Sequence, residues 1–137
     1  MKRFAVATAS ILLMALAIKV SAAEPNEGKT ASGIVITTLK EGAGANPKAA
    51  DVVKVHYRGT LTDGKEFDSS YKRGQPATFA LNRVIPCWTE GVQTMKVGGK
   101  VKLLCPSNLA YGSRGVPGVI PANASLVFEV ELLEIAK

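Results

Sequence analysis

The sequence predicts an α+β fold in which an antiparallel sheet of about five strands wraps around one short α-helix. Two observations carry this prediction. After residue 33, apolar and polar residues alternate over several stretches, as in strands with one buried face. Only one stretch instead repeats apolar residues (Trp88, Val92 and Met95) at i, i+4 and i+7, which is one face of a helix. A lone helix among strands is buried most simply when the sheet curves over it, with Trp88 near the bottom of the concavity.

The first 23 residues have the pattern of a secretory signal peptide. Lys2 and Arg3 precede an apolar run, and the small residues before position 24 suit cleavage after Ala23. A membrane anchor is the alternative, but the run of about 15 residues is shorter than the roughly 20 that a span needs. We therefore expect an exported protein that keeps no membrane segment once the signal is cleaved.

Charge and length describe what remains after such a cleavage. Residues 1–23 hold three of the 17 basic residues and none of the 11 acidic ones, so the rest has 14 against 11 and a net charge of +3. Its basic residues are scattered rather than gathered in a stripe, which argues against nucleic-acid binding. The polar residues 24–32 are predicted to form a disordered leader, and residues 33–137 to form one domain.

The elements of that domain follow from the pattern in chain order. Strands are predicted at residues 34–39, 52–58, around Phe79 and Leu81, at 100–105, and at 125–135. Asp63-Gly64 is a hairpin signal, and the helix is expected over 84–95, ended by Gly98-Gly99. Residues 106–124 form a long loop that is rich in Gly and Pro yet carries apolar residues, which is typical of functional loops.

The sequence contains none of the usual sets of polar catalytic residues. The only histidine, His56, falls on the polar face of the 52–58 strand with no nucleophile or carboxylate evident beside it, so we expect a surface residue. A single His and the absence of a C-x-x-C motif argue against a metal site. Cys87 and Cys105 suit a disulfide in an oxidising compartment, while two buried free thiols are the alternative.

Aromatic and aliphatic residues accumulate instead on the expected concave side. Such a lining with few polar groups fits a cleft for an apolar ligand, although plain core packing is the alternative. Two tyrosine hydroxyls among them, and Asp68 next to Phe67, favour the cleft, because buried polar tips need partners. The residues are Tyr57, Phe67, Trp88, Tyr111 and Phe128, with Val84, Ile85 and Ile120.

Several motifs together resemble the FKBP-type peptidyl-prolyl cis–trans isomerases. They are V-H-Y-R-G-T-L-x-D-G-K-E-F-D-S-S, V-I-P-x-W-x-E-G, L-A-Y-G, P-G-x-I-P and L-V-F-E-V-E-L-L, and they follow one another over residues 33–136 with the spacing of the family. With its signal-like start, the chain is similar to single-domain bacterial members that are periplasmic or secreted. The resemblance implies an FKBP-like sheet around the helix and a substrate pocket between the two.

The resemblance also implies a site and a reaction. It implies isomerisation of Xaa-Pro bonds during the folding of exported proteins, with the twisted prolyl amide bound in an aromatic pocket and no covalent intermediate. Trp88 would be the floor, the Ile85 N–H and the Tyr111 hydroxyl would bind substrate carbonyls, and Asp68 would face Tyr57 and Arg73. The implied catalytic residues are Tyr57, Phe67, Asp68, Trp88, Tyr111 and Phe128, and the implied substrate-binding residues are Arg73, Val84, Ile85 and Ile120.

The same resemblance sets expectations for partners. Proline-containing polypeptides are the expected substrates, macrolides such as tacrolimus and rapamycin the expected inhibitors, and the protein is expected to be a monomer without a cofactor. The chain differs from the family archetype at three positions, Ala77, Val116 and Val119. We expect these differences to affect substrate preference and macrolide affinity. A non-catalytic chaperone that grips unfolded chains, and a structural protein whose aromatics are only core, are the rival hypotheses.

Overall fold

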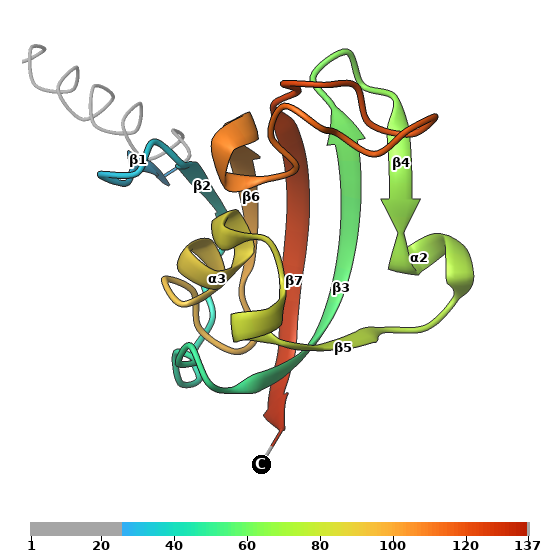
Figure 1. The fold of residues 1–137 in the computed structure, drawn as a ribbon. Helices are drawn as coiled ribbons and strands as arrows, with labels where there is room; N and C mark the ends of the chain where they lie inside the picture. Colours follow the sequence, from blue (N-terminus) through green and yellow to red (C-terminus); the bar gives the residue numbers. More distant parts are fainter. Residues whose placement is uncertain (1–25, 137) are drawn as a thin grey trace, which may run out of the picture.

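A computed structural model describes residues 26–136 (Figure 1). The predicted signal peptide, residues 24 and 25, and the final residue lie outside the described part of the chain. The strands are β1 (Asn26–Lys29), β2 (Val35–Lys40), β3 (Val52–Leu61), β4 (Glu66–Ser69), β5 (Ala77–Ala80), β6 (Lys100–Cys105) and β7 (Leu126–Ala136). The helices are α2 (Ser70–Arg73) and α3 (Pro86–Val92), with the 3-10 turns η1 (Leu81–Arg83) and η2 (Ser107–Leu109).

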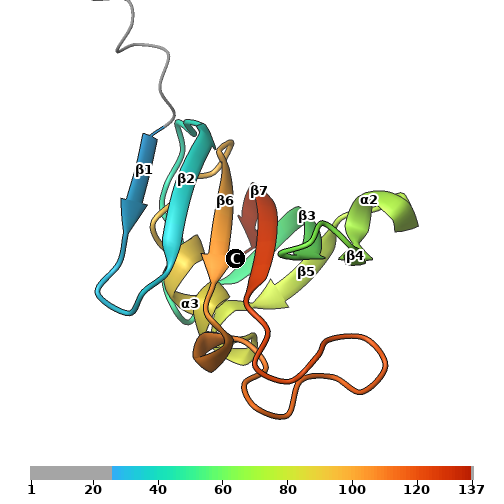
Figure 2. The ribbon, with the colours of Figure 1, turned by 90° about the horizontal axis from the view of Figure 1, so that it is seen from above.

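All seven strands form one antiparallel sheet. Its order is β1-β2-β6-β7-β3-β4, and β5 pairs with β3 beside the first half of that strand (Figure 2). The expected α+β class is therefore confirmed, with seven strands in place of about five. The two longest strands, β3 and β7, lie in the centre of the sheet and pair with each other along their whole length.

The alternation in the sequence becomes one buried and one exposed face. In β6, Val101, Leu103 and Cys105 are buried while Lys102 and Leu104 between them are exposed. In β7, every second residue from Leu126 to Leu132 is buried in the same way. Burying these apolar side chains on one side is the main driving force for the curvature, since that side must cover the helix.

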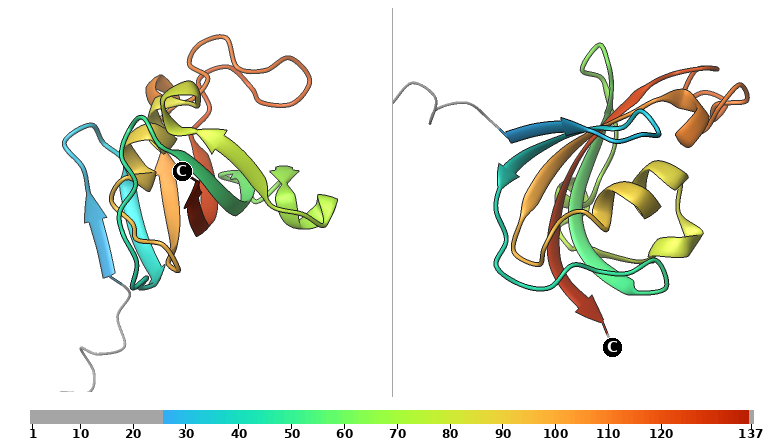
Figure 3. Two further views of the ribbon diagram at one scale, coloured as in Figure 1. Left: turned by 90° about the horizontal axis from the view of Figure 1, so that it is seen from below. Right: turned by 90° about the vertical axis from the view of Figure 1, so that its left-hand side faces the viewer.

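Helix α3 lies in the concavity of the sheet (Figure 3). Pro86 occupies its first turn, where a missing N–H costs nothing, and its buried side carries Cys87, Trp88, Gly91 and Val92. Gly91 permits a close approach to β6, because a Cβ there would lie 2.9 Å from a methyl carbon of Leu103. The helix is thus held against the sheet at the place where Trp88 points inward.

A disulfide joins Cys87 at the start of α3 to Cys105 at the end of β6, with a Cα–Cα separation of 5.7 Å. Both residues are fully buried. Of the two alternatives that the sequence left open for these cysteines, the structure therefore has the disulfide. The bond ties the helix that carries Trp88 directly to the sheet.

Three expectations for the elements were wrong. Residues 26–29 are not disordered but form β1, which pairs with β2 through a turn closed by the Thr30 side chain, whose hydroxyl accepts from the Ile34 N–H at 3.1 Å. The helix ends at Val92 rather than Met95, and Leu81 lies in η1 rather than in a strand. Met95 is nevertheless buried, in tighter turns that follow the helix.

The end of α3 is shaped by a residue from a distant loop. The Asn46 side-chain amide donates to the carbonyl oxygens of Gln93 and Met95 at 3.1 and 2.9 Å. These carbonyls follow the last turn of the helix, and pairing them stabilises the change of direction there. In the part of the chain that the structure describes, no helix is long and apolar enough to cross a membrane.

Candidate active site

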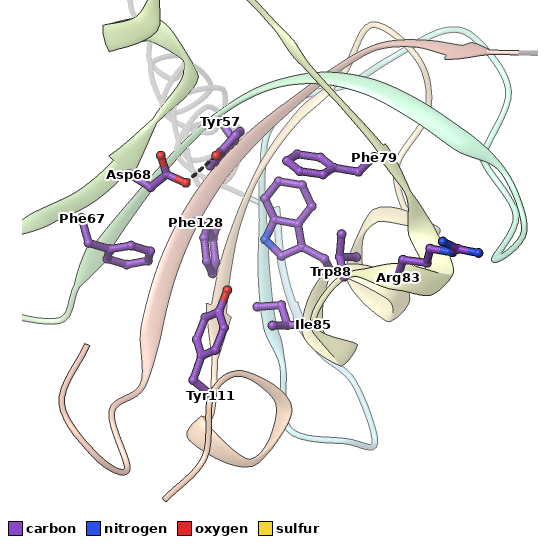
Figure 4. A pocket seen from close by; sticks show the side chains of 10 residues that line it. Tyr57, Phe67, Asp68, Phe79, Arg83, Ile85, Trp88, Tyr111 and Phe128 are labelled. Atoms are coloured by element: carbon purple, nitrogen blue, oxygen red, sulfur yellow. Dashed lines mark hydrogen bonds between the residues drawn. The ribbon is translucent and has the colours of Figure 1, made fainter. Parts of the chain in front are cut away.

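A cavity of about 460 Å³ lies between the concave face of the sheet, η1 and α3 (Figure 4). That is within the range of small-molecule and peptide sites. Most of its lining is aromatic or aliphatic, with few polar groups. The lining residues are Tyr57, Phe67, Asp68, Phe79, Arg83, Val84, Ile85, Trp88, Tyr111 and Phe128.

Trp88 forms the floor of this pocket. Its ring is 4% exposed and stands nearly perpendicular to three others, those of Tyr57, Phe79 and Phe128, at centroid distances of 5.3, 5.4 and 5.5 Å. Edge-to-face contacts of this kind suit the charge distribution of aromatic rings and hold the indole in place. Its Nε1 is buried and has no acceptor among the described residues. The floor is therefore rigid and almost wholly apolar.

One wall is made by Phe67 and Phe128, whose rings meet edge to face at 5.6 Å. Gly59 on β3 lies directly behind them, and a Cβ there would be 2.7 Å from Phe67 and 2.8 Å from Phe128. Real Cβ atoms do not come so close, so the wall depends on the absence of a side chain at Gly59. The strand thereby brings its backbone up against both rings.

A polar cluster lies beside this wall, where Asp68 follows Phe67 on β4 (Figure 4). The Tyr57 hydroxyl donates to Asp68 Oδ2 at 2.5 Å and accepts from Arg73 Nη2 at 3.0 Å, and Arg73 Nη1 donates to Asp68 Oδ1 at 2.7 Å. Helix α2 positions Arg73: the Ser69 hydroxyl caps its start and Gly74 ends it. The three side chains thus satisfy one another's hydrogen-bonding groups.

These contacts also set the protonation states. Burial alone would raise the pKa of Asp68, but the hydrogen bonds from Tyr57 and Arg73 outweigh it, so the pKa lies below its usual value. Burial, and then the hydrogen bond to Asp68, raise the pKa of Tyr57 above its usual value. Near neutral pH the pocket therefore contains a charged carboxylate beside a protonated tyrosine hydroxyl.

Besides Trp88 Nε1, one backbone donor and one hydroxyl donor of the pocket have no partner among the described residues. One is the backbone N–H of Ile85, the residue that precedes the first turn of α3. The other is the hydroxyl of Tyr111, a residue that is 40% exposed and whose hydroxyl points into the pocket in Figure 4. Ile85 and Tyr111 come from different segments, one next to α3 and one from the loop between β6 and β7.

The structure brings most of the predicted site residues together in this pocket. Arg73 and Ile120 are the exceptions among them, since neither lines the cavity. Arg73 lies behind Asp68 and acts on the pocket only through Asp68 and Tyr57, while Ile120 is buried in the core, 5% exposed, under the long loop. The role of these two residues in substrate binding stays a prediction.

Two lining residues were not predicted. Phe79 is on β5 and packs edge to face on both Tyr57 and Trp88, at 5.8 and 5.4 Å. Its aromatic character and its place on the same side of the strand as Ala77 are a signal that could have found it. Arg83, at the end of η1, has no such signal, because an arginine in a turn is ordinarily only a surface residue.

The His56 side chain makes two contacts that the sequence did not indicate. Its ring stacks on Tyr71 at 4.6 Å, and its Nδ1 lies 2.8 Å from the hydroxyl of Ser70. Ser70 is fully buried and is also bonded to the backbone of Tyr57, so its hydroxyl cannot meet a substrate. His56 is partly exposed, as expected of a residue on the polar face of the strand, and the pair lies outside the pocket lining with the geometry of a structural contact.

No group of three or more His, Cys, Asp or Glu side chains among residues 26–136 is arranged to hold a metal ion. The pocket lining likewise offers one carboxylate, no histidine and no thiol. What the arrangement can do is bind a compact apolar group on Trp88 while donating hydrogen bonds to carbonyl oxygens on either side.

Comparison with known proteins agrees with this geometry. The family model of the FKBP-type peptidyl-prolyl cis–trans isomerases matches residues 44–133. The FKBP-type peptidyl-prolyl cis–trans isomerase FkpA of Aeromonas hydrophila is 65% identical over 108 residues, which are 79% of this chain and 40% of that protein. The chain thus spans about 40% of the length of the first curated relatives that it matches.

Solved structures show the same fold. The crystal structure of FkpA from Escherichia coli is similar with a TM-score of 0.78 and 50% identity, covering 85% of this chain and 55% of that one. A peptidyl-prolyl cis–trans isomerase from Pseudomonas syringae pv. tomato has a TM-score of 0.77 and 38% identity, covering 98% of this chain and all of that one.

Proposed function

The chain belongs to the family of FKBP-type peptidyl-prolyl cis–trans isomerases, and from this premise we propose that it catalyses the rotation of Xaa-Pro peptide bonds in polypeptides. The observation that carries the proposal is the rigid aromatic pocket on Trp88, with the unpaired donors of Ile85 and Tyr111 beside it. This pocket has the size for a proline ring and its flanking amides rather than for a large cofactor.

The proposed mechanism follows from the nature of the barrier. Rotation about a peptide bond is opposed by amide resonance, with a barrier of roughly 18–20 kcal/mol, so neither a nucleophile nor a proton transfer is strictly required. At the top of the barrier the amide is twisted, has lost resonance, and its carbonyl is less polar. An apolar pocket therefore binds the twisted amide at a smaller desolvation cost than the planar one, which lowers the barrier.

The polar groups would hold the substrate during this rotation. In this proposal the Ile85 N–H and the Tyr111 hydroxyl bind carbonyls of the substrate, so that one side of the prolyl bond turns while the other stays in place; both residues line the pocket, which supports the proposal. The Tyr57–Asp68–Arg73 cluster stabilises the wall opposite and keeps a fixed polar point beside the rotating carbonyl. No covalent intermediate is formed in this scheme.

The setting of the activity is also part of the proposal. The signal-like residues 1–23 and a buried disulfide suit a protein that is exported, to the periplasm or beyond, where it would act on folding polypeptides. Residues 33–137 would be the catalytic domain, and macrolides such as tacrolimus and rapamycin would compete for the pocket.

The test is isomerisation of a short Xaa-Pro peptide by purified protein lacking residues 1–23, with and without rapamycin. We expect acceleration that the drug abolishes, and a fall of at least tenfold in kcat/KM for Trp88→Ala. His56→Ala is the matched control, since His56 lies outside the pocket, and it should keep its activity. Well-folded protein that accelerates no peptide but suppresses aggregation of an unfolded client would instead favour the non-catalytic chaperone.

A further inference from the structure

The pocket has one charged side chain that its own neighbours do not neutralise. Two lining residues are charged, Asp68 and Arg83. Asp68 is paired with Arg73 at 2.7 Å, whereas the four ion pairs among the described residues do not include Arg83. Arg83 is therefore the charged lining residue that has no ion-pair partner among the described residues.

Arg83 lines the pocket close in sequence to one of its free donors. It ends η1, two residues before Ile85, whose N–H is one of the free donors. In Figure 4 it lies at the far side of Trp88 from Asp68, and its guanidinium points away from Trp88. A proline ring seated on Trp88 would not touch the guanidinium, but a residue a short distance along the same chain would.

From this placement we infer that Arg83 is a specificity-determining residue that favours substrates with an acidic side chain next to the proline. The inference rests on the proposed isomerase function and adds to it the chemical class of the preferred substrate. An acidic residue would pair with the exposed guanidinium, while a basic residue at the same point would be repelled by it.

The size of the effect follows from the exposure of Arg83. Ion pairs between exposed side chains are weak, which corresponds to a preference of about two- to fivefold in kcat/KM rather than to an absolute requirement. Such a preference is also screened by salt, because the Debye length falls from about 10 Å at 0.1 M to about 3 Å at 1 M. The inference therefore predicts both a charge preference and its salt dependence.

The experiment measures catalysed cis–trans exchange by NMR in two series of capped pentapeptides. Ala-Xaa-Pro-Phe-Ala places the variable residue before the proline, and Ala-Leu-Pro-Xaa-Ala places it after, with Xaa being Glu, Gln or Lys in each. Gln is the uncharged match for Glu, so the Glu/Gln ratio of kcat/KM isolates the charge. We expect a ratio of about two to five in at least one series, with Lys below Gln, and a fall of that ratio toward one at high salt.

Two variants locate the effect. Arg83→Gln should bring the Glu/Gln ratio to about one, whatever its absolute rate. Lys102→Gln removes the same charge from an exposed position on β6, on the face of the sheet that does not cover α3, and should leave the ratio unchanged. Equal rates for Glu and Gln peptides in both series, or a ratio that survives in Arg83→Gln, would overturn the inference while leaving the isomerase intact. Failure to accelerate any peptide would overturn the proposed function, and this inference with it.

Discussion

At the scale of single residues, Asp68 shows how the pocket keeps a charge in an apolar wall. Its two oxygens receive hydrogen bonds from Tyr57 and Arg73, and these lower its pKa despite the burial that would raise it. A carboxylate with a lowered pKa in the folded state stabilises the fold above the pKa of the unfolded chain. That contribution is lost as the pH falls below the ordinary value near 3.8 and through the lower folded-state value.

We therefore predict that Asp68 remains charged, and that pocket activity does not change from this cause, between pH 7 and pH 5. Below about pH 4 the free energy of unfolding should fall more steeply for the native protein than for Asp68→Asn, which has no charge to lose. Urea unfolding followed by Trp88 fluorescence at pH 7, 5, 4 and 3 measures this. If the free energies of unfolding of the two proteins fell equally with pH, Asp68 would not have the lowered pKa that its contacts imply.

Gly59 yields a second prediction at this scale. Gly59→Ala would put a Cβ within 3 Å of both Phe67 and Phe128, so at least one ring must move. Overpacking of this kind costs about 1–3 kcal/mol of stability, and here the displaced rings belong to the pocket wall. We expect a loss of kcat/KM of about tenfold or more in the peptide assay, together with a lower unfolding midpoint.

The matched control for this change is Gly28→Ala. Gly28 lies on β1, a Cβ there meets nothing within 4 Å, and its backbone needs no positive φ. It should leave both the midpoint and the activity as they are. An active and fully stable Gly59→Ala protein would mean that the Phe67–Phe128 wall is more yielding than its packing indicates.

Residue type explains which parts of the site could be predicted from the sequence. Trp88, Tyr57 and Phe128 stand on regular elements, so the periodicity of the sequence is enough to place them on the buried side. Arg73 was placed in the substrate-binding set by family resemblance, and Ile120 by that resemblance and its apolar character, whereas the folded chain turns Arg73 behind Asp68 and Ile120 into the core. Periodicity locates a face, but it does not tell which residues of that face remain open to a cavity.

At the scale of elements, the disulfide is a bond outside the pocket lining that fixes the helix carrying Trp88. It closes a loop with a sequence separation of 18 and links the first turn of α3 to the end of β6. In the chain-entropy account, closing a loop of this length stabilises the fold by about 3 kcal/mol. The bond also fixes the residue next to Trp88 against the sheet.

We predict that the double variant Cys87→Ala/Cys105→Ala loses about 3 kcal/mol in urea unfolding but still folds. Reductant should lower the stability of the native protein to a similar level and leave the double variant unchanged, which makes the variant its own control. Because the bond lies beneath the floor and not in the lining, residual activity of the folded variant should exceed that of Trp88→Ala. A native protein whose unfolding ignores reductant would contradict this prediction.

The elements themselves divide into those that the pattern reveals and those that it does not. Strands β3, β6 and β7 alternate apolar and polar residues over most of their length, and the sequence located them well. Strand β1 (N-E-G-K) has no apolar residue and is held by its pairing with β2, so its composition alone made it look like a leader. The early end of α3 depends on the amide of Asn46, almost 50 residues away, which no local pattern can show.

At the scale of the whole molecule, the sheet has a concave face filled by α3 and outer strands that are protected against further pairing. β1 at one edge carries Glu27 and Lys29, both charged and exposed. At the other edge, β4 is four residues long, and its Glu66 is paired with Arg58 at 2.7 Å. Short, charged edges of this kind are a common protection against strand-to-strand association.

The distribution of the exposed apolar side chains also argues against association between copies of the chain. The large ones, Leu39, Tyr71, Leu104, Tyr111 and Val119, are distributed over two strands, helix α2 and the long loop. A stable interface buries about 800 Å² on each partner around a compact apolar centre, and scattered side chains do not supply one. The surface that is described therefore favours a protein that acts as a single chain.

We accordingly predict a monomer for the protein lacking residues 1–23. Sedimentation velocity between about 5 and 200 μM should give the mass of one chain, both in low and in high salt. The reason is that we expect neither pairing of edge strands nor attraction between charges to hold two copies together. Leu104→Ser is a useful companion variant, since it removes an exposed apolar group from the outer face of β6 and should sediment identically. A mass that rises toward two chains with concentration in the native protein, and returns to one chain in the variant, would show instead that the outer face of the sheet is an interface between copies.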